Sequence, residues 1–199
     1  MSDFSPRLLG GFAATVSAEL GRENFLAVLE KASLPLEWAD AAALARPDPA
    51  AAGEVYAGLQ KGLRTYYGRG ARGILLRVGG KFWKRLLDDS PLALKPQIAL
   101  TRGLPPGARR KATLDLLARL LSTRAAEVTV HTLDLDLLLV DHASPAAMGQ
   151  SETEPICWVT VGLIRESLYW ANHREFDVTE ISCRALGAQA CEFKIQTGA

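Results

Sequence analysis

The segment Cys157–Cys191 has the sequence CWVTVGLIRESLYWANHREFDVTEISCRALGAQAC. It contains every cysteine of the 199-residue chain, at positions 157, 183 and 191, and Glu180 stands three residues before the middle one. Thiolates and carboxylates are both zinc ligands, and a structural zinc ion is usually held by four protein ligands in a tetrahedron. The spacing C-x22-E-x2-C-x7-C therefore indicates one metal site built from Cys157, Glu180, Cys183 and Cys191.

The two later cysteines belong to a predicted hairpin. Residues 176–182 (FDVTEIS) alternate and are rich in β-branched side chains, which is typical of a strand, and residues 191–196 (CEFKIQ) are a second candidate strand. A loop of three residues with Gly187 in the left-handed region would pair these strands symmetrically about position 187. Cys183 would then face Cys191 with Cβ atoms about 4.5–5.5 Å apart. Cys157 would join them from the start of the preceding helix.

Glu180 is the uncertain fourth ligand. Strict alternation puts its side chain on the strand face opposite to that of Cys183. The two share a site only if the strand bulges or twists between them, or if Cys183 lies beyond the regular ladder. Four protein ligands leave no position for a metal-bound water, so such a site would be structural and not catalytic. Three thiolates and a carboxylate around Zn²⁺ carry about two net negative charges, which predicts a compensating cation nearby from Arg165, Arg184 or Lys194.

Two other interpretations of the cysteines stay open on spacing alone. Free cysteine is commonly a small buried hydrophobic residue. Facing cysteines on a hairpin could also form a disulfide, although nothing in the sequence indicates an oxidising compartment. The spacing by itself therefore predicts three thiolate ligands and leaves the fourth ligand uncertain.

Residues 155–195 resemble the C-terminal half of the 4-vinyl-reductase domain family, and they are similar to the aromatic-sensing domains of phenol- and xylene-responsive bacterial transcription activators. The likeness rests on P-I-C-W around position 157 and on C-R-A-L-G and C-E-F, which begin at positions 183 and 191. Those sensors carry a Cys, Glu, Cys, Cys zinc set that matches this chain position by position. The resemblance therefore implies a structural Zn²⁺ held by Cys157, Glu180, Cys183 and Cys191.

The resemblance also implies an architecture and a kind of ligand. The expected fold is α+β, an antiparallel sheet of about four strands with helices packed mainly on one side, as in the trafficking-particle subunits that share this fold. A homodimer and a buried ligand cavity beside the zinc are expected as well. The phenol sensors hold the ligand hydroxyl with a His–Trp pair, but an ungapped count finds Ala108 and Asp136 there, so phenol itself is not implied.

Composition places the chain among ordinary globular proteins. Its length suits one domain with a small extension. We expect an N-terminal helical extension over residues 1–47 and a binding domain over residues 48–199. Hydrophobic residues make up 48% of the chain, and a formal net charge of +1 gives no general attraction to nucleic acid or membranes. The chain lacks an apolar run of about 18 residues and a secretory signal pattern, so a cytoplasmic protein without a membrane span is expected.

Periodic patterns predict the remaining elements. Strands are expected over 127–132 and 136–140, antiparallel to the later hairpin because the connections are short. Residues 89–106 contain four prolines and are expected to be mostly loop that could cover a cavity mouth. In the third helix, Val55, Leu59, Leu63 and Tyr66 are expected to face inward. The expected helices span residues 7–20, 22–32, 48–67, 71–88, 107–123 and 157–171.

Two groups of polar residues have competing explanations. A basic stripe lies on the predicted helix 71–88; a solvated face is its common explanation, and acidic lipid, nucleic acid or ligand carboxylates are the alternatives. No aromatic interleaving on the stripe and no known reading motif supports nucleic-acid binding, so a nucleic-acid partner is not expected. A possible second metal cluster follows later, although turn and capping roles are commoner for such residues. The stripe is Arg77, Lys81, Lys84 and Arg85, and the cluster is Asp134, Asp136, Asp141 and His142.

No catalytic motif accompanies these features. The glycines at 68, 70, 79 and 80 do not follow a strand, as a phosphate-binding loop would, and no G-x-S-x-G sequence is present. His131, His142 and His173 have no motif partners, and zinc binding would use every thiol. An enzyme is therefore not the favoured interpretation.

A binding pocket is better supported. The helix over 157–171 would present aliphatic residues on one face, and aromatic side chains could complete a mostly apolar pocket, with plain core packing as the competing explanation for each residue. The candidate pocket residues are Trp83, Trp158, Val161, Ile164, Leu168 and Tyr169.

Two functions follow from these expectations. The first is a sensor or carrier domain that binds a hydrophobic or aromatic small molecule and signals through a homodimer to a separate partner. The second, implied by the family name, is a tetrapyrrole-handling protein of bacteriochlorophyll synthesis, either a 4-vinyl reductase or a pigment chaperone. Because no nicotinamide or flavin site is recognisable, a chaperone is favoured over a reductase within the second class.

Overall fold

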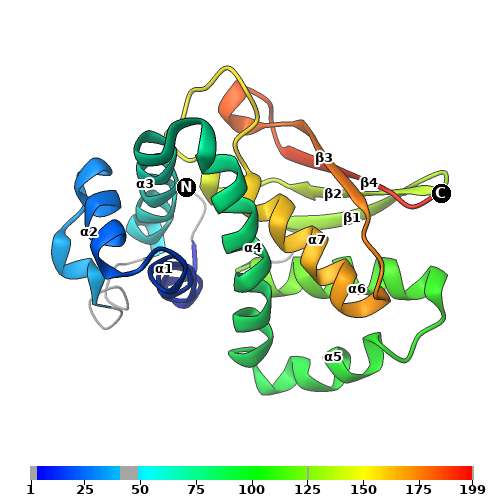
Figure 1. The fold of residues 1–199 in the computed structure, drawn as a ribbon. Coiled ribbons are helices and arrows are strands. Elements are labelled where there is room, and N and C mark those ends of the chain that lie inside the picture. Colours follow the sequence, from blue (N-terminus) through cyan, green and yellow to red (C-terminus); the bar gives the residue numbers. More distant parts are fainter. Residues whose placement is uncertain (1–3, 41–48, 125, 199) are drawn as a thin grey trace.

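The computed structural model describes residues 4–40, 49–124 and 126–198, and all but one of its described α-helices precede the strands along the chain (Figure 1). The three helices at the N-terminal end pack together, on the side of the molecule away from the sheet. The helices before the sheet are α1 (Pro6–Leu20), α2 (Arg22–Lys31), α3 (Pro49–Tyr67), α4 (Ala71–Asp88), α5 (Lys95–Thr101) and α6 (Pro106–Leu121).

The strands of the described residues form a four-stranded antiparallel sheet in the order β1-β2-β4-β3. Two hairpins build it, β1 (Val128–Leu133) with β2 (Asp136–Asp141) and β3 (Asp177–Ser182) with β4 (Cys191–Gln196). Helix α7 (Trp158–Asn172) connects the hairpins, and the central strands β2 and β4 pair with each other. Alternate residues of β4 are buried and the residues between them are partly exposed, so helices cover one face. The predicted α+β class and antiparallel sheet are confirmed.

Helix α7 crosses α4 at backbone contact. A Cβ atom on Gly79 would stand 2.2 Å from the carbonyl oxygen of Val159, and one on Gly162 would stand 2.2 Å from the carbonyl oxygen of Leu76. No side chain fits in such a space, so glycine is required at both positions. The crossing holds α7, whose first turn enters the candidate site, firmly against the helical part of the molecule.

Helices α1 and α2 share the hydrophobic core with the rest of the chain. The Phe12 ring of α1 lies 4.5 Å from the Tyr56 ring of α3 and 6.0 Å from the Phe82 ring of α4, measured between centroids. Phe25 of α2 is fully buried in the same cluster. The predicted boundary between residues 1–47 and 48–199 falls within residues 41–48, outside the described part of the chain, so that division stays a prediction.

Two sequence-based expectations about elements are wrong. Residues 89–106 contain helix α5, in which Pro96 occupies the first turn, where its missing N–H leaves no helical hydrogen bond unmade. On α3, Tyr66 is exposed, whereas Tyr56, ten residues earlier in the same helix, is buried. Among the described helices, none combines the length and the apolar character that crossing a bilayer requires.

Candidate metal centre and adjacent cavity

A bulge in β3 brings Glu180 beside the cysteines. Glu180 pairs with Phe193, but Ser182 pairs with Glu192, so the register shifts by one residue, and Ile181 between them is exposed. Continued by one residue, the shifted register places the cysteine after Ser182 opposite the cysteine before Glu192, as a hairpin symmetric about position 187 predicts. The connection is longer than three residues and contains a 3-10 turn, yet Gly187 has the expected left-handed φ, at 89°.

Four potential ligand atoms converge behind this bulge. The Sγ atom of Cys157 lies 3.5 Å from that of Cys191 and 4.0 Å from that of Cys183, and the last two are 4.0 Å apart. With one carboxylate oxygen of Glu180 they form a group whose atoms all lie within 4.8 Å of one another. Tetrahedral Zn–S bonds of about 2.3 Å put sulfur atoms about 3.8 Å apart, so the group fits one such ion. A disulfide needs about 2.05 Å, and all three thiols are free.

The four acids cannot all ionise at this distance without a cation. Burial, and then contact with Cys183, raise the pKa of Glu180 to about 8. The thiols of Cys183 and Cys191 together with burial raise the pKa of Cys157 well above its usual range. The pKa of Cys183 moves down, because hydrogen bonds from the other two thiols stabilise its thiolate. A bound divalent cation would take the place of these protons, since metal-bound thiols are deprotonated.

Hydrogen-bond donors surround the same group. Cys157 is the N-cap of α7, and its backbone N–H donates to Glu180 Oε2 at 2.9 Å. The Arg184 N–H donates to Cys191 Sγ at 3.3 Å, and Ser144 Oγ lies 3.5 Å from Cys157 Sγ. Glu180 Oε1 is buried without a hydrogen-bond partner among the described residues. A buried orphaned oxygen costs about 1–3 kcal/mol, and coordination to a cation would remove that cost.

The side chains predicted to compensate the charge have other partners. Lys194 forms an ion pair with Asp136 at 3.2 Å. The guanidinium groups of Arg165 and Arg184 both donate to backbone carbonyl oxygens. Within the described residues, the donors seen at the thiols are therefore the backbone and hydroxyl groups above.

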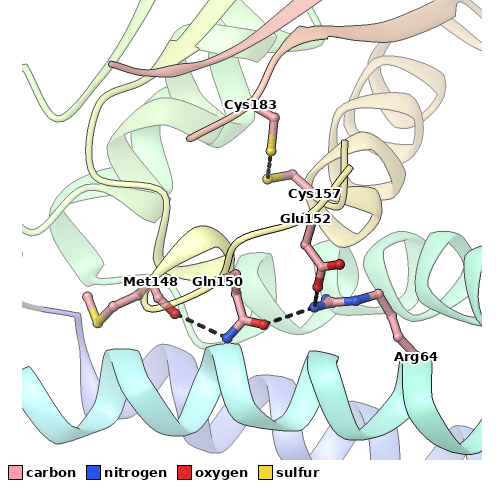
Figure 2. A network of polar contacts seen from close by, with 6 residues as sticks. All are labelled: Arg64, Met148, Gln150, Glu152, Cys157 and Cys183. Atoms are coloured by element: carbon pink, nitrogen blue, oxygen red, sulfur yellow. Dashed lines mark hydrogen bonds and ion pairs between the residues drawn. The ribbon is translucent and has the colours of Figure 1, made fainter. Parts of the chain in front are cut away.

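The loop over residues 142–157 ties this centre to α3. Figure 2 shows Arg64 of α3 reaching into the loop, where its Nη2 donates to Glu152 at 2.9 Å and to Gln150 at 3.1 Å. The Gln150 amide donates in turn to the Met148 carbonyl oxygen. In the same view the loop ends at Cys157, whose sulfur points toward that of Cys183. One segment therefore carries a candidate metal ligand and the polar contacts that hold the loop to α3.

A small enclosed cavity of about 30 Å³ lies next to this loop. A water molecule needs about 10–15 Å³ on this measure, so the cavity holds about two waters. Its wall is mostly apolar and combines α3, α4, α7, the sheet and the loop. The wall includes Tyr56, Phe82, Asp141, Ala146, Thr160 and Leu163.

Polar groups converge on this apolar cavity. Asp141 is buried, its Oδ1 accepts hydrogen bonds from the N–H groups of Ala143 (3.0 Å) and Ser144 (2.7 Å), and burial raises its pKa to about 6. Burial also raises the pKa of Tyr56 far above its usual range, with the nearby acids Cys157 and Asp141 adding to the shift. The Tyr56 hydroxyl is therefore a neutral donor at physiological pH.

The pocket residues predicted from the sequence lie elsewhere. The three aliphatic ones are buried in the core, Trp83 packs edge-on against Trp170 at 5.6 Å between ring centroids, and Trp158 is partly buried. Tyr169 is 47% exposed and borders an open surface groove. Their helix neighbours Thr160 and Leu163 are the ones that reach the cavity. Its wall includes none of Trp83, Trp158, Val161, Ile164, Leu168 and Tyr169.

The second group of possible metal ligands does not assemble. Asp136 accepts a hydrogen bond from the Thr197 N–H and pairs with a lysine, while Asp141 holds the turn that follows β2. In the described part of the chain, the group that meets the geometric requirements for a metal is Cys157, Glu180, Cys183 and Cys191.

Residues 141–197 match the family model of the 4-vinyl-reductase domain, which confirms the predicted resemblance. The matched region includes the four potential ligands, α7 and the cavity residue Asp141. It spans less than a third of the chain. No match to a curated protein sequence was found.

Several solved structures share the fold at low sequence identity. The phenol-responsive sensory domain of the transcription activator PoxR, in complex with phenol, has a TM-score of 0.51 and 16% identity, over 74% of this chain and 73% of that domain. An H-NOX protein from S. oneidensis in the Fe(II)NO state has a TM-score of 0.58 and 12% identity over 100% of both chains. An H-NOX mutant from K. algicida has a TM-score of 0.55 and 14% identity, over 98% of this chain and 97% of that chain. Such identities establish the fold and leave the ligand open.

Proposed function

We propose that the chain is a non-catalytic small-molecule-binding domain, a sensor or carrier for a hydrophobic or aromatic ligand, in which a structural Zn²⁺ staples the C-terminal hairpin to α7. One observation carries this proposal: an enclosed, mostly apolar cavity with converging polar groups adjoins a closed set of three thiols and a carboxyl group. The match to the 4-vinyl-reductase domain and the fold shared with the PoxR domain, whose structure contains phenol, support small-molecule sensing.

Zinc is the ion that these ligands favour. Thiolates select soft or borderline metals, and the sulfur spacing suits a tetrahedron, whereas calcium and magnesium prefer oxygen donors. Cys157 would fasten the first turn of α7, and Cys183 and Cys191 would close the loop at the end of the hairpin. Because the four protein ligands complete the tetrahedron, the ion has no open position for a reacting water.

The cavity suits a ligand that is apolar over most of its surface and carries one hydrogen-bonding group. Phe82, Ala146 and Leu163 provide apolar contacts. Tyr56 offers a neutral hydroxyl, and Asp141 offers a carboxyl group that burial favours in its neutral form near pH 6. Buried polar groups of this kind discriminate strongly against ligands that leave them unpaired. A phenolic or alcoholic hydroxyl meets this requirement.

A ring-sized ligand would need the cavity to widen. The loop over 142–157 supplies Ala143, Pro145 and Ala146 to its wall, and a few polar contacts to α3 and the hairpin hold this segment in place. Loops and side chains at binding sites commonly rearrange on binding. We therefore expect this loop to move outward when a ligand enters, while the zinc site keeps its end at Cys157 fixed.

Calorimetric titration of the zinc-loaded protein with phenol and with toluene tests the pocket. Tyr56→Phe should weaken phenol binding by about tenfold and leave toluene binding nearly unchanged, because it removes a single hydroxyl. Tyr67→Phe is the matched control, since Tyr67 does not line the cavity. Equal effects of the two substitutions, or no binding of any small aromatic compound, would count against this pocket. Native mass spectrometry of the purified protein would then identify any ligand that it carries.

Tetrapyrrole handling is the second candidate function. The H-NOX likeness covers the whole chain, and one of the similar H-NOX structures concerns the function of heme distortion. Against it, the cavity is far smaller than a porphyrin, and the three histidines are exposed and lie outside its wall. A Soret band that appears when porphyrin is added, and that disappears in Ala146→Phe, would favour this candidate over the first.

The expectations of a homodimer and of a separate signalling partner belong to the same proposal. They rest on the resemblance to sensory domains, and multi-angle light scattering of the zinc-loaded protein tests the dimer directly. A mass twice that of the chain is expected.

A further inference from the structure

We propose that the groove between α4 and α7 is a docking surface for an acidic helical segment of a partner protein. The groove has a volume of about 550 Å³ and lies along the crossing of the two helices, on the outside of the core. Its walls carry Arg77, Lys81, Lys84 and Arg165. The proposal does not depend on which ligand occupies the cavity.

The floor of this groove is apolar and fixed. Leu76, Gly80 and Gly162 form it, next to the point where the two helix backbones touch. At this crossing the two backbones touch, and the Glu166 side chain lies within 4.0 Å of the position that a Cβ atom on Gly80 would take. A rigid apolar floor between charged walls is the arrangement that an amphipathic helix recognises with one face.

The charges on the walls are arranged along one side of α4. Arg77, Lys81 and Lys84 follow each other at helical spacing over about 10 Å. Arg165 of α7 also lines the groove, and its Nη2 donates to the Val178 carbonyl oxygen of β3. Glu19 pairs with Arg77 at 3.0 Å and with Lys81, yet both of these cations keep 61% of their side chains exposed. Lys84 forms no ion pair within the described residues. Carboxylates spaced by one helical turn on a partner would meet these cations.

Other anionic partners fit this groove less well. Glu166 lines the groove beside Gly80, and Glu19 pairs with Arg77 and Lys81, so both carboxylates would repel a continuous row of phosphates. No aromatic side chain lines it for base stacking, and no large exposed hydrophobic residue lines it for insertion into a bilayer. A polypeptide partner can carry both signs of charge, so its own Lys, Arg or N–H groups can pair with the two glutamates.

The position of the groove suits an output surface. Helix α7 begins at the ligand Cys157, lines the cavity with Thr160 and Leu163, and then lines the groove with Gly162 and Arg165. Helix α4 likewise contributes to both sides. A partner seated on this groove therefore contacts the same two helices that surround a bound small molecule.

Fluorescence anisotropy with a designed peptide tests the proposal on the zinc-loaded full chain. The probe is a labelled helical peptide with Glu at positions i, i+4 and i+7 of its Leu-bearing face, and its control has Gln at those positions. The Glu peptide should bind about tenfold or more tightly than the Gln peptide, and its binding should weaken as salt is raised.

Charge reversals locate the binding surface. Lys84→Glu combined with Arg165→Glu should weaken binding of the Glu peptide by about tenfold or more, and the neutral Lys84→Gln should show a smaller loss. Lys31→Glu combined with Lys61→Glu changes net charge equally at exposed positions on α2 and α3, and should change binding by about twofold or less. Zinc content and melting temperature should be the same in all variants, which separates this test from that of the zinc site and the pocket.

Three results would overturn the proposal. The first is equal weakening by the groove variants and their control. The second is equal affinity for the Glu and Gln peptides. The third is tighter binding, through Lys84 and Arg165, of a single-stranded oligonucleotide or of vesicles made from phosphatidylglycerol and phosphatidylcholine in equal parts.

Discussion

The three thiols and the carboxyl group near the C-terminal end converge in an arrangement that a bound metal cation would stabilise. One oxygen of Glu180 is buried without a hydrogen-bond partner among the described residues. Burial raises the pKa of Glu180, and the neighbouring thiols raise the pKa of Cys157. Without metal, these groups hold protons at neutral pH. With metal, the same positions become a closed ligand set, so metal affinity and folding stability are linked.

Replacing one sulfur should remove the metal. Cys183→Ser or Cys191→Ser is expected to abolish stoichiometric zinc binding and lower the melting temperature by about 5 °C or more, since a loss of about 2 kcal/mol shifts a domain of this size by several degrees. Metal analysis together with differential scanning calorimetry checks both effects. An unchanged melting temperature in a metal-free variant would show that the site does not staple the fold.

The carboxylate ligand allows a finer test. Glu180→Gln should keep the fold and weaken zinc affinity by about tenfold to a hundredfold, because an amide is a poorer ligand than a carboxylate. Glu192→Gln, on the outward side of the adjacent strand, is the matched control and should leave affinity unchanged. Competition with a chromophoric chelator measures both constants. Equal affinity of the two variants would remove Glu180 from the ligand set.

Asp141 should produce a defined pH dependence. Its pKa is raised from 3.8 to about 6 in the folded protein, so the fold favours the protonated form. The contribution to stability is therefore complete below about pH 4 and is lost as the pH rises toward 6 and above. Relative to Asp141→Asn, which stays neutral, the wild type should lose about 2–3 kcal/mol of unfolding free energy between pH 4 and pH 7. Urea denaturation at both pH values measures this difference, and a constant difference would contradict it.

Sequence reasoning reached the candidate metal site but not the cavity. The cysteine and glutamate spacing, with the family resemblance, predicted the four residues that converge. Alternation required a bulge, a twist or the end of the regular ladder after Glu180, and the structure has a bulge. Tyr56 and Asp141 were out of reach as cavity residues, because they belong to α3 and β2 and meet only in the folded chain. On α7, periodicity chose the face with Val161 and Ile164, while Thr160 and Leu163 reach the cavity.

The crossing of α4 and α7 is the element contact on which site and groove both depend. Gly79 and Gly162 allow the two backbones to touch, and α7 carries a candidate metal ligand, cavity residues and groove residues within a few turns. The sequence shows these glycines only as residues within two predicted helices. Their purpose depends on which helices meet, and local patterns do not determine that.

A single methyl group at this crossing should be costly. Gly162→Ala is expected to reduce the unfolding free energy by about 1–3 kcal/mol or more, because its Cβ would stand 2.2 Å from the Leu76 carbonyl oxygen. Gly10→Ala in α1 meets no atom within 4 Å and should instead stabilise by about 0.5–1 kcal/mol. Urea denaturation compares the two. Similar effects of both substitutions would show that the helices are not in close contact.

Helix α5 shows where proline misleads. The prolines of residues 89–106 predicted a loop, but one of them sits in the first turn of a helix, a position that suits it. The buried Thr101 and the partly buried Ile98 then pack this short helix against its neighbours. Its existence depends on this packing, because seven residues are too few for a helix to be stable alone.

At the scale of the whole molecule, the N-terminal helices α1 and α2 are part of the hydrophobic core. Phe12 and Phe25 are buried against residues far along the chain, which a sequence-based boundary between residues 47 and 48 does not anticipate. The fold class and the order of elements could be predicted because periodicity and connection lengths are local properties. The packing of α1 and α2 could not, because it depends on contacts between distant parts of the chain.

The most direct test of the zinc staple is metal analysis of the purified protein combined with X-ray absorption at the zinc edge. One zinc ion per chain is expected, with three sulfur neighbours near 2.3 Å, one oxygen near 2.0–2.2 Å and no further ligand from solvent. Chains that fold fully and cooperatively without stoichiometric metal, or a zinc ion with a water in its fourth position, would contradict the account.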